Sequence, residues 1–513
     1  MSAVPPPPPP APAAPSGETA APPLGVPDDG LDWRRMHPVT PVVRGWGVIV
    51  VLFLVGFNQV ATDVEGAGEV VSSVNPLWFV GGLAFFALVV FLYSALAWRM
   101  MRYAVGAEAV HLRQGIVFRQ QRQARLDRLQ AVDIVQPLVA RIFGLAELRL
   151  EVAGGADSAV KVGFLKIGDA ETLRAELLAR AAGVTVAEGE AAPVAPEEQV
   201  IQVEPGMLVG SLLRTGALLA FLAILVGLGV AAVLAHTAAP LLSAIPGLIG
   251  FGSYLAQRFV GEYGFVGAVS PDGIRLRRGL LETRSQTIPP GRVQAIRLSQ
   301  PLLWRRKDWW RVEVNVAGYG SITADAKSSS QVLLPVGDRR AALDALWLVL
   351  PDLGLTDALA VLDEALVGSG PSETFTTSPR SARILDPLTW RRNGFAVAPR
   401  ALLLRQGRLV RQLVVVPHER TQSLGVEQGP LQRRLGVASF ALHTTVGPVT
   451  PQIAHLAEAD AARLLAEQDE RARTARNSEG PELWMRQIAT EPVAEVVTEP
   501  VTEPAAEPTG DGA

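Results

Sequence analysis

Apolar residues gather into four long runs along the chain, and elsewhere they alternate with polar residues. A run of about 20 apolar residues is long enough to cross the hydrocarbon core of a bilayer as a helix. The runs come in two pairs, and a short polar segment separates the members of each pair. The pattern therefore predicts two transmembrane hairpins. The predicted spans are Val42–Ala61, Pro76–Trp98, Gly216–Ala235 and Ala238–Ala256.

The fourth run is the weakest of these signals. It contains Pro240 and Pro246, and proline kinks or ends a helix because it lacks a backbone N–H and its ring clashes with the preceding turn. Whether this run makes a full crossing is open, and a long buried hairpin is the competing interpretation of the second pair.

Basic residues flank the runs on one side only. Arg44 lies at the start of the first run, Arg99 follows the second, Arg214 precedes the third and Arg258 follows the fourth, whereas the two turns carry no Lys or Arg. Because cytoplasmic flanks are enriched in Lys and Arg, we expect a multi-pass protein with both termini and every large segment in the cytoplasm. No run has a central charged residue, which disfavours ion-coupled transport.

A second pattern repeats three times outside the apolar runs. The stretches "ARLDRLQAVDIVQ", "IPPGRVQAIRLSQ" and "VPHERTQSLGVEQ" align without gaps, together with the residues on either side of them. So many coincidences in one ungapped window indicate a triplicated unit. The coinciding arginines are Arg113, Arg128, Arg141, Arg277, Arg292, Arg305, Arg405, Arg420 and Arg433. The coinciding glutamines and turn glycines are Gln130, Gln136, Gln294, Gln300, Gln422, Gln428, Gly115, Gly279 and Gly407.

Each copy has the same internal order of predicted elements. Two strands flank a glycine-containing turn, further alternating strands follow, and an amphipathic helix ends the copy. In the first copy Leu173, Leu177 and Leu178 lie at helical spacing. The pattern predicts a bent antiparallel sheet or partly open barrel closed by a C-terminal helix. The fold class is thus membrane α-helical hairpins combined with three α+β or mainly-β units.

The two ends of the chain are of low complexity. The beginning is rich in proline and the end is acidic and punctuated by proline, so neither buries enough apolar surface to order itself. The predicted organisation is a Pro-rich tail at 1–40, hairpin 1 at 41–98, unit 1 at 99–184, a linker at 185–206, hairpin 2 at 207–257, unit 2 at 258–352, a linker at 353–385, unit 3 at 386–474 and an acidic tail at 475–513.

The stretches "RVQAIRLSQPLLWRR" and "RTQSLGVEQGPLQRRLGVASFAL" resemble the bacterial pleckstrin-homology-like domains of the membrane-flanked YdbT/YdbS (DUF304, bPH2) family. The resemblance covers residues 40–475. It implies a bacterial inner-membrane protein, a pair of sheets with seven strands closed by a helix, and no catalytic residues. The second copy departs from the others, since Asp308 stands where they have Gly144 and Gly436, and three tryptophans crowd its turn.

Composition excludes several kinds of site. The chain has no cysteine, which rules out disulfides, zinc–thiolate sites and iron–sulfur clusters. The six histidines show no metal-binding spacing, and no phosphate-binding loop or nucleophile elbow is present. We therefore expect no enzyme, no cofactor and no metal. The net charge of −3 and the scattered arginines argue against a nucleic-acid partner.

Two functions remain open at the level of sequence. In the first, the units of a membrane-anchored interaction protein bind lipid headgroups or protein partners, and the repeated arginines form a phosphate-binding face. The other interpretation of these arginines is that they hold the fold together. In the second, the units regulate the helices of a transport or export system. The expected partners are the bilayer and either a membrane protein or further copies of this chain.

Overall fold

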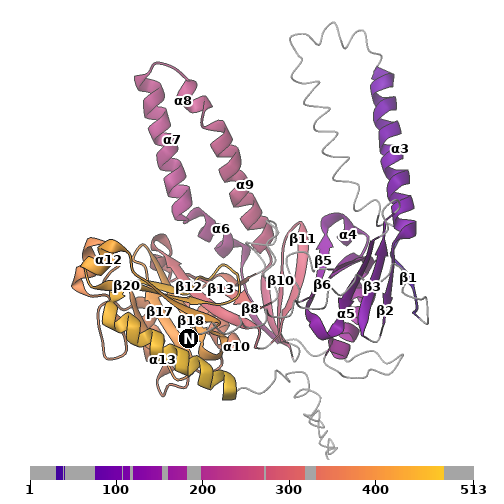
Figure 1. Cartoon of the computed structure of the whole chain (residues 1–513). Coiled ribbons are helices and arrows are strands. Elements are labelled where there is room, and N and C mark those ends of the chain that lie inside the picture. Colours follow the sequence, from indigo (N-terminus) through magenta and orange to yellow (C-terminus); the bar gives the residue numbers. More distant parts are fainter. Residues whose placement is uncertain are drawn as a thin grey trace, which may run out of the picture. The chain divides into compact units, whose positions relative to one another are not determined.

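The structure is a computed structural model, shown in Figure 1. It describes residues 31–38, 40, 76–106, 108–115, 120–152, 160–181, 198–270, 273–289, 291–317 and 331–478. The chain divides into two compact units, Met1–Arg125 and Leu126–Ala513, and each is described by itself. The predicted span Val42–Ala61 and most of the two predicted tails lie outside the described residues.

The first unit contains one helix and a four-stranded antiparallel sheet. Its elements are β1 (Arg34–Arg35), α3 (Pro76–Met100), β2 (Arg102–Val105), β3 (Ala109–Gln114) and β4 (Gln120–Arg125), with the strands in the order β1-β2-β3-β4. The foot of α3 is tied to the start of the unit, because Trp98 Nε1 donates a hydrogen bond to the Met36 carbonyl at 2.9 Å. The Arg113 guanidinium lies 4.1 Å from the centre of the Trp33 ring.

The second unit consists of short antiparallel strands with helices between them. The strands are β5 (Leu129–Pro137), β6 (Leu145–Val152), β7 (Val160–Lys166), β8 (Glu198–Gln202), β9 (Val266–Ser270), β10 (Gly273–Arg278), β11 (Glu282–Ile288), β12 (Val293–Pro301), β13 (Trp310–Val316), β14 (Val332–Gly337), β15 (Thr376–Thr377), β16 (Gly394–Val397), β17 (Ala401–Gln406), β18 (Val410–Pro417), β19 (Ser423–Glu427), β20 (Val437–His443) and β21 (Gln452–Ala457). The α-helices are α4 (Leu138–Ile142), α5 (Ile167–Ala181), α6 (Pro205–Leu213), α7 (Gly216–Leu234), α8 (Ala239–Leu242), α9 (Ile245–Glu262), α10 (Arg339–Val349), α11 (Ala358–Val367), α12 (Pro430–Arg434) and α13 (Glu458–Ser478). The short 3-10 helices are η1 (Leu126–Arg128), η2 (Leu302–Lys307), η3 (Arg380–Ile384) and η4 (His418–Arg420).

In sequence order the elements fall into three copies of one scheme, which we call modules. Module 1 comprises β1–β7 and α5, module 2 comprises β8–β14 and α10, and module 3 comprises β15–β21 and α13. Each module has four strands, then three strands, then a helix. The predicted order of strands followed by a closing helix is confirmed. Leu173, Leu177 and Leu178 of α5 are buried, as their helical spacing predicted.

The sheets of the second unit cross the boundaries between modules. The three-stranded part of one module continues into the four-stranded part of the next, which makes two seven-stranded sheets, β7-β6-β5-β11-β10-β9-β8 and β14-β13-β12-β18-β17-β16-β15. The last module ends in the three-stranded sheet β19-β20-β21. Instead of the partly open barrel, the described strands form open sheets, and none of these closes on itself.

The two pairings between successive modules, which we call joint 1/2 (β5 with β11) and joint 2/3 (β12 with β18), have the same register. At joint 1/2 Ile134 pairs with Ser285, and at joint 2/3 the repeat equivalents Leu298 and Leu413 pair. All four residue pairs of joint 1/2 have their equivalents at joint 2/3, which extends further to six pairs. The pairing between successive modules is therefore a feature of the repeated unit.

The apolar hairpin is inserted inside a module. In module 2 the helices α6 to α9 lie between the first strand, β8, and the second, β9, and these two strands pair with each other. Module 1 has α3 between the paired strands β1 and β2, and module 3 has only η3 and its flanking residues between β15 and β16. Each insertion thus begins and ends at two adjacent paired strands, which places its two feet side by side.

This insertion shifts the predicted domain boundaries. Strand β1 lies within the predicted tail 1–40, β8 within the predicted linker 185–206, and α11 and β15 within the predicted linker 353–385. Strands β1 and β15 were missed because they have only two residues each, too few to show alternation, and β8 was missed because its sequence EQVIQ does not alternate.

Two helices in the described part of the chain are long and apolar enough to cross a membrane, Gly216–Leu234 and Ala239–Glu262. Only 6% of each is buried, which is not the environment of the buried hairpin considered above. The second is interrupted between α8 and α9. Pro240 lies in the first turn of α8, and Pro246 lies in the first turn of α9. Helix α3 coincides with the predicted span Pro76–Trp98. The predicted total of four spans is not confirmed.

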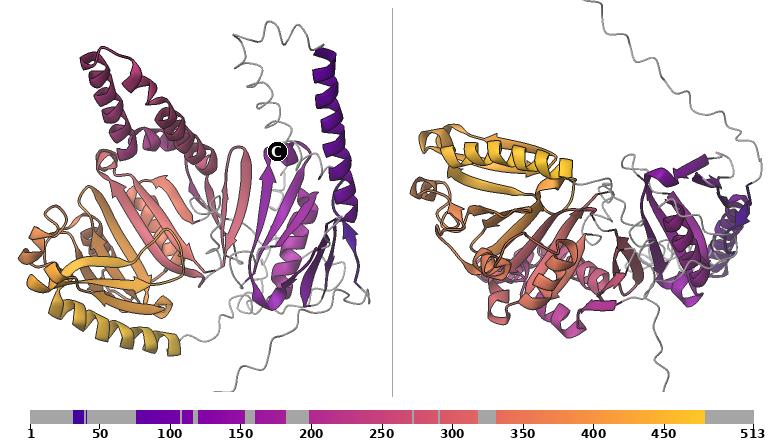
Figure 2. Two further views of the ribbon diagram at one scale, coloured as in Figure 1. Left: turned by 45° about the horizontal axis from the view of Figure 1, so that its top comes forward. Right: turned by 90° about the horizontal axis from the view of Figure 1, so that it is seen from below.

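The closing helices cover the three-stranded parts of the sheets. Helix α5 packs on β5–β7, α10 on β12–β14 and α13 on β19–β21, and the views in Figure 2 show α13 along the face of its sheet. One core joins modules 2 and 3 across β12 and β18, where Ile296, Leu298 and Leu413 are buried together. A second core, around Phe440, fills the space between β17–β18 and β20–β21.

Candidate anion-binding site

The repeated glycines and one set of repeated glutamines serve the fold. Gly279 and Gly407 have φ of +107° and +78°, and a Cβ atom at either would lie within about 2 Å of a backbone oxygen. Gln136 and Gln428 donate to the equivalent carbonyls of Leu145 and Val437, at 3.4 and 3.3 Å. The side chains close the turn that precedes the next strand.

Module 2, whose sequence departs from the other copies at Asp308, closes this turn differently. Asp308 adopts the left-handed conformation, with φ of +49°, that Gly144 and Gly436 adopt in the other modules. Its carboxylate accepts hydrogen bonds from Gln300 Nε2 at 2.8 Å and Trp310 Nε1 at 2.9 Å. The substitution exchanges a backbone acceptor for a side-chain acceptor.

Arg405 is a structural residue. It is fully buried, and its guanidinium donates to the carbonyls of Arg392, Glu364 and Gly370 at 3.3, 3.2 and 2.8 Å. Its Cζ lies 4.3 Å from the centre of the Phe375 ring. Burial lowers its pKa and the Glu364 carboxylate raises it, with burial the stronger influence. Arg405 is therefore out of reach of a membrane lipid.

Arg141 and Arg305 each donate a hydrogen bond to a backbone carbonyl of the next module, and we call them the latch arginines. Arg141 Nη1 donates to the Leu280 carbonyl at 3.3 Å, and Arg305 Nη2 donates to the Arg408 carbonyl, which is the repeat equivalent. Both acceptors directly follow the turn glycine of the neighbouring module. The third equivalent, Arg433, is exposed.

The other repeated residues differ in their environments. Arg277 and Arg128 are exposed, Arg292 is partly buried, and Arg420 lies 3.9 Å from the Glu419 carboxylate. Gln294 is buried and Gln422 is exposed, and the side chain of Gln130 lies outside the description. The repeated arginines thus differ in burial and in partners.

One cavity nevertheless gathers arginines, and we call it the arginine pocket. It has a volume of about 430 Å³ and lies where module 2 meets module 3. None of the described residues that line it carries a carboxylate. Its lining residues are Arg305, Val367, Ser369, Arg383, Pro387, Leu388, Trp390, Arg391, Arg392, Arg408 and Arg411.

Arg392 forms the floor of the arginine pocket. It is 5% exposed and donates to the carbonyls of Gly368, Leu366 and Ala365 at 2.5, 2.6 and 3.0 Å, which satisfies the C-terminal end of α11. Its Nε is buried without a partner among the described residues. Burial, and then repulsion by the neighbouring arginines, lowers the pKa of Arg392 to about 9.

The rim of the arginine pocket carries guanidinium groups that have no acid to neutralise them. Arg383, Arg391 and Arg408 are exposed, and within the described part of the chain their side chains make no hydrogen bond or ion pair. The Arg391 guanidinium lies 5.3 Å from the centre of the Trp390 ring. Guanidinium groups match the oxygens of a phosphate or carboxylate, so the pocket can hold an anion.

The arginine pocket lies close to the foot of the apolar hairpin. Arg305 belongs to η2, and Trp304 of the same short helix donates to the Ser211 carbonyl of α6 at 3.2 Å. Trp309 lies beside α6 as well, with the Arg214 guanidinium 5.5 Å from its ring centre. Helix α6 leads directly into the membrane-length helix α7.

A comparison with known proteins identifies the modules. The family model described as "Bacterial PH domain" matches residues 50–181, 214–344 and 360–472, which is more than half of the chain. The chain belongs to this family. Its three matches coincide with the three modules, so the predicted triplication and the resemblance are both confirmed.

A curated protein is similar to this chain along part of its length. The UPF0699 transmembrane protein YdbT of Bacillus subtilis (strain 168) is 23% identical over 284 residues, which cover 49% of this chain and 57% of that protein. The chain thus matches little more than half of its relative. No solved structure matches.

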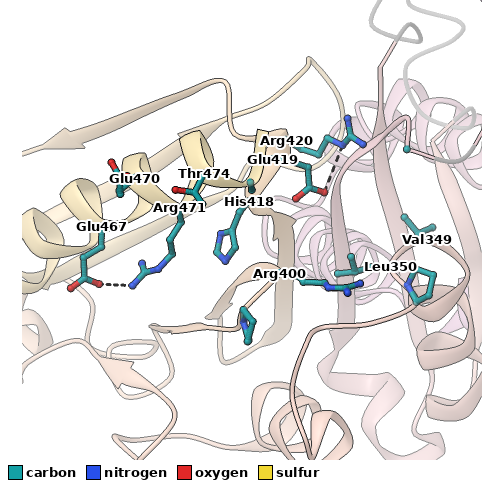
Figure 3. A pocket seen from close by; sticks show the side chains of 14 residues that line it. Val349, Leu350, Arg400, His418, Glu419, Arg420, Glu467, Glu470, Arg471 and Thr474 are labelled. Atoms are coloured by element: carbon teal, nitrogen blue, oxygen red, sulfur yellow. Dashed lines mark hydrogen bonds and ion pairs between the residues drawn. The ribbon is translucent and has the colours of Figure 1, made fainter. Parts of the chain in front are cut away.

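The larger cavity of the bacterial PH modules has a different electrostatic character. It has a volume of about 870 Å³ and lies against η4 and α13 of module 3 (Figure 3). Its arginines have carboxylate neighbours: Arg471 lies 2.7 Å from Glu467, and Arg400 lies 3.5 Å from Asp352. This neutralised surface is a poorer anion site than the smaller arginine pocket.

The three tryptophans that crowd the turn of module 2 lie in two environments. Trp304 and Trp310 are buried in the core, whereas Trp309 is only partly buried, against α6. Most residues of the arginine pocket escaped the sequence analysis because they are not repeated. The available signal was the run Trp390-Arg391-Arg392, which places an aromatic ring beside two cations as Trp304-Arg305-Arg306 does.

Proposed function

We propose that this protein is a multi-pass, membrane-anchored interaction protein whose arginine pocket binds the phosphate of an anionic lipid headgroup. The observation that carries the proposal is the cluster of six lining arginines, without a carboxylate, next to the foot of a membrane-length hairpin. A basic residue near an anionic bilayer surface contributes about 1 kcal/mol.

The segment between β15 and β16 supports this proposal. It occupies the position in module 3 where module 2 carries its hairpin, and it supplies Arg383 and Arg391 to the pocket. It also exposes apolar side chains, since Ile384 is 74% and Leu388 55% exposed. Exposed apolar side chains beside free cations suit the interface between headgroups and acyl chains. We infer that module 3 touches the membrane with this segment.

The test measures binding of short-chain lipids to the detergent-solubilised full-length protein by calorimetry. Short-chain phosphatidylglycerol should bind and phosphatidylcholine should not. Replacing Arg383 and Arg408 by Gln should weaken phosphatidylglycerol binding by about thirtyfold, since two basic residues contribute about 2 kcal/mol.

The matched control is Arg380→Gln, an exposed residue of the same 3-10 helix that does not line the pocket. Inorganic phosphate is the third titrant. Equal affinity for phosphate and for the lipid would assign the pocket to a soluble anion, and binding of phosphatidylglycerol unaffected by the double substitution would refute the proposal.

The orientation follows from the basic flanks of the apolar runs. We propose that both termini and all three modules lie in the cytoplasm of a bacterial cell. A reporter fused after Gly68 should then be detected outside the inner membrane, and one fused after Glu190 inside. The opposite pattern would invert the topology.

A transport or export component is the second candidate, and one feature favours it. Both feet of the second hairpin are held by module 2: α6 through Trp304, and the end of α9 through Glu262, whose carboxylate lies 2.7 Å from Arg311 Nη2. Movement of the module would therefore move the helices. Substrate flux into liposomes that contain the purified protein, abolished by Glu262→Gln, would support this function over the first.

A further inference from the structure

The last sheet of the chain ends where the two preceding sheets continue. In modules 1 and 2 the strands β5 and β12 pair with a strand of the following module. Their repeat equivalent in module 3 is β19, and it is the edge strand of β19-β20-β21. No described residue pairs with the outer edge of β19. None of the described residues supplies the strand that would continue the series.

The exposure of one side chain in module 3 agrees with the free edge of β19. Ile134 and Leu298 are equivalent residues of the two joints and are 3% and 0% exposed, whereas their equivalent in β19, Val426, is 37% exposed. The joint covers this position in modules 1 and 2 and leaves it open in module 3. An apolar side chain is thus exposed at the one copy of the position that has no neighbouring module.

The latch arginine is also unused at this end. Arg141 and Arg305 donate to the carbonyl after the turn glycine of the next module. Arg433 is exposed, and its side chain makes no contact of this kind with any residue that the structure describes. Among the described residues, module 3 therefore lacks a partner strand for β19, an apolar cover for Val426 and a carbonyl acceptor for Arg433.

The complementary edge is present at the other end of the chain. Strands β11 and β18, which complete the two joints, are the fourth strands of their modules, and the fourth strand of module 1 is β4. It is the terminal strand of the sheet β1-β2-β3-β4. Among the described residues, β4 pairs with β3 alone, so its other edge has no partner strand there.

We propose that β19 of one copy of this protein pairs with β4 of a second copy in the register of the two internal joints. This register places Glu427 opposite Gln120 and Leu424 opposite Gln123. An unprotected edge strand readily pairs with another strand, and β19 carries neither Lys nor Pro to prevent this. Because the two surfaces differ, the association is head to tail and builds a ring or a filament.

Cysteine cross-linking tests this register directly, since the natural chain contains no cysteine. One population of the full-length protein carries Glu427→Cys and the other carries Gln120→Cys, with different tags, and the two are co-expressed and oxidised in native membranes. Each chain has one thiol, so every cross-link joins two copies. The proposal predicts a cross-link between the two tags.

The matched control uses Gln123→Cys in place of Gln120→Cys. Gln123 is also exposed and belongs to the same strand. It lies three residues away, about 10 Å along the strand and on the other face, so this cross-link should be lost. Equal cross-linking of both pairs would indicate random collision and overturn the proposal. Cross-links between two Glu427→Cys chains alone would indicate a symmetric pairing of β19 and overturn it too.

A measurement of mass completes the test. The detergent-solubilised protein should be larger than a monomer in light scattering, and Val426→Lys should convert it to a monomer because it places a charge in the pairing edge. Arg433→Ala should weaken assembly, and its exposed neighbour Arg434→Ala should not. A natural protein that is monomeric in detergent would exclude a second copy as the partner of β19. A double variant with both Glu427→Cys and Gln120→Cys serves as a further check: a cross-link that forms only within one such chain would exclude a second copy as well.

Discussion

Joints 1/2 and 2/3 share a register but differ in side-chain chemistry. At joint 2/3, Leu298 and Leu413 meet across the strands and both are fully buried. At joint 1/2 the equivalent of Leu413 is Ser285. The joint strand β11 buries Gln286, whose side chain lies 3.4 Å from that of Arg278, which is buried in the adjacent strand β10. Burial, followed by repulsion from Arg284, lowers the pKa of Arg278 to about 10.

The difference separates two contributions to a joint. The backbone ladder is compatible with either set of side chains, so it specifies which strands meet and in which register. The side chains set the strength of the joint, because apolar burial stabilises by about 25 cal/mol per Å² whereas a buried polar pair contributes little net free energy. Joint 2/3 should accordingly be the stronger of the two, and several measurements can break or sharpen this comparison.

The largest effect is expected at the repeated arginine beside joint 2/3. Arg405→Met leaves three buried carbonyls without their donor and should lower the free energy of unfolding by roughly 3–5 kcal/mol, as removal of a partner from a buried charged group does. The repeat equivalent Arg277 is exposed, so Arg277→Met should change it by less than about 0.5 kcal/mol. Thermal unfolding of the detergent-solubilised variants measures both, and equal losses would contradict the assignment.

The joints themselves come next. Leu298→Ala removes a fully buried side chain that faces Leu413, and it should cost about 2–5 kcal/mol. Ile134→Ala removes the equivalent side chain opposite Ser285 and should fall at the lower end of that range. Limited proteolysis should then cut the Leu298→Ala protein between modules 2 and 3. A greater loss from Ile134→Ala would reverse the proposed order of the joints.

Acid should destabilise module 3 through a group that module 1 lacks. His418 is buried, its Nε2 lies 2.8 Å from the Ala398 carbonyl, and its Nδ1 accepts from Gln468 at 2.9 Å. Burial is the main cause that lowers its pKa, so the folded state holds it neutral. The unfolded chain takes up a proton near pH 6.5, and stability is therefore full above that pH and falls below it, by up to about 1.4 kcal/mol per pH unit.

The equivalent residue in module 1, Leu126, has no such proton to gain. Unfolding of the natural protein and of His418→Gln, followed between pH 8 and pH 5, should show that the variant lacks the additional slope below about pH 6.5. Identical slopes would remove His418 from the account.

The smallest effect concerns the latches. Arg141→Ala and Arg305→Ala each remove hydrogen bonds to a carbonyl of the next module and should cost about 1 kcal/mol. They differ in a second measurement, because only Arg305 lines the arginine pocket. Phosphatidylglycerol binding should weaken in the Arg305 variant alone, and a loss of binding in both would separate the anion site from the pocket.

Much of each module was predictable from the sequence because it is written in local patterns. Alternation predicted strands such as β3 and β4 around Gly115, and helical spacing predicted α5. The third apolar run predicted α7 almost to the residue. The three family matches fall on the three predicted copies. In the candidate site the repeat pointed to one member, Arg305, and the remaining arginines of the pocket had no equivalent in the other copies to attract notice.

What the sequence determined by itself is the triplication, the type of each longer element and the two apolar runs of the second hairpin, since burial and backbone propensity act on neighbouring residues. The tertiary structure alone decided that the sheets run from one module into the next, that a hairpin sits between two paired strands, and that Arg305 and Arg392 line one pocket. The physical reason is the backbone ladder. Its hydrogen bonds are the same for Leu298 opposite Leu413 as for Ile134 opposite Ser285, so the pairing of distant strands leaves no uniform trace in their side chains.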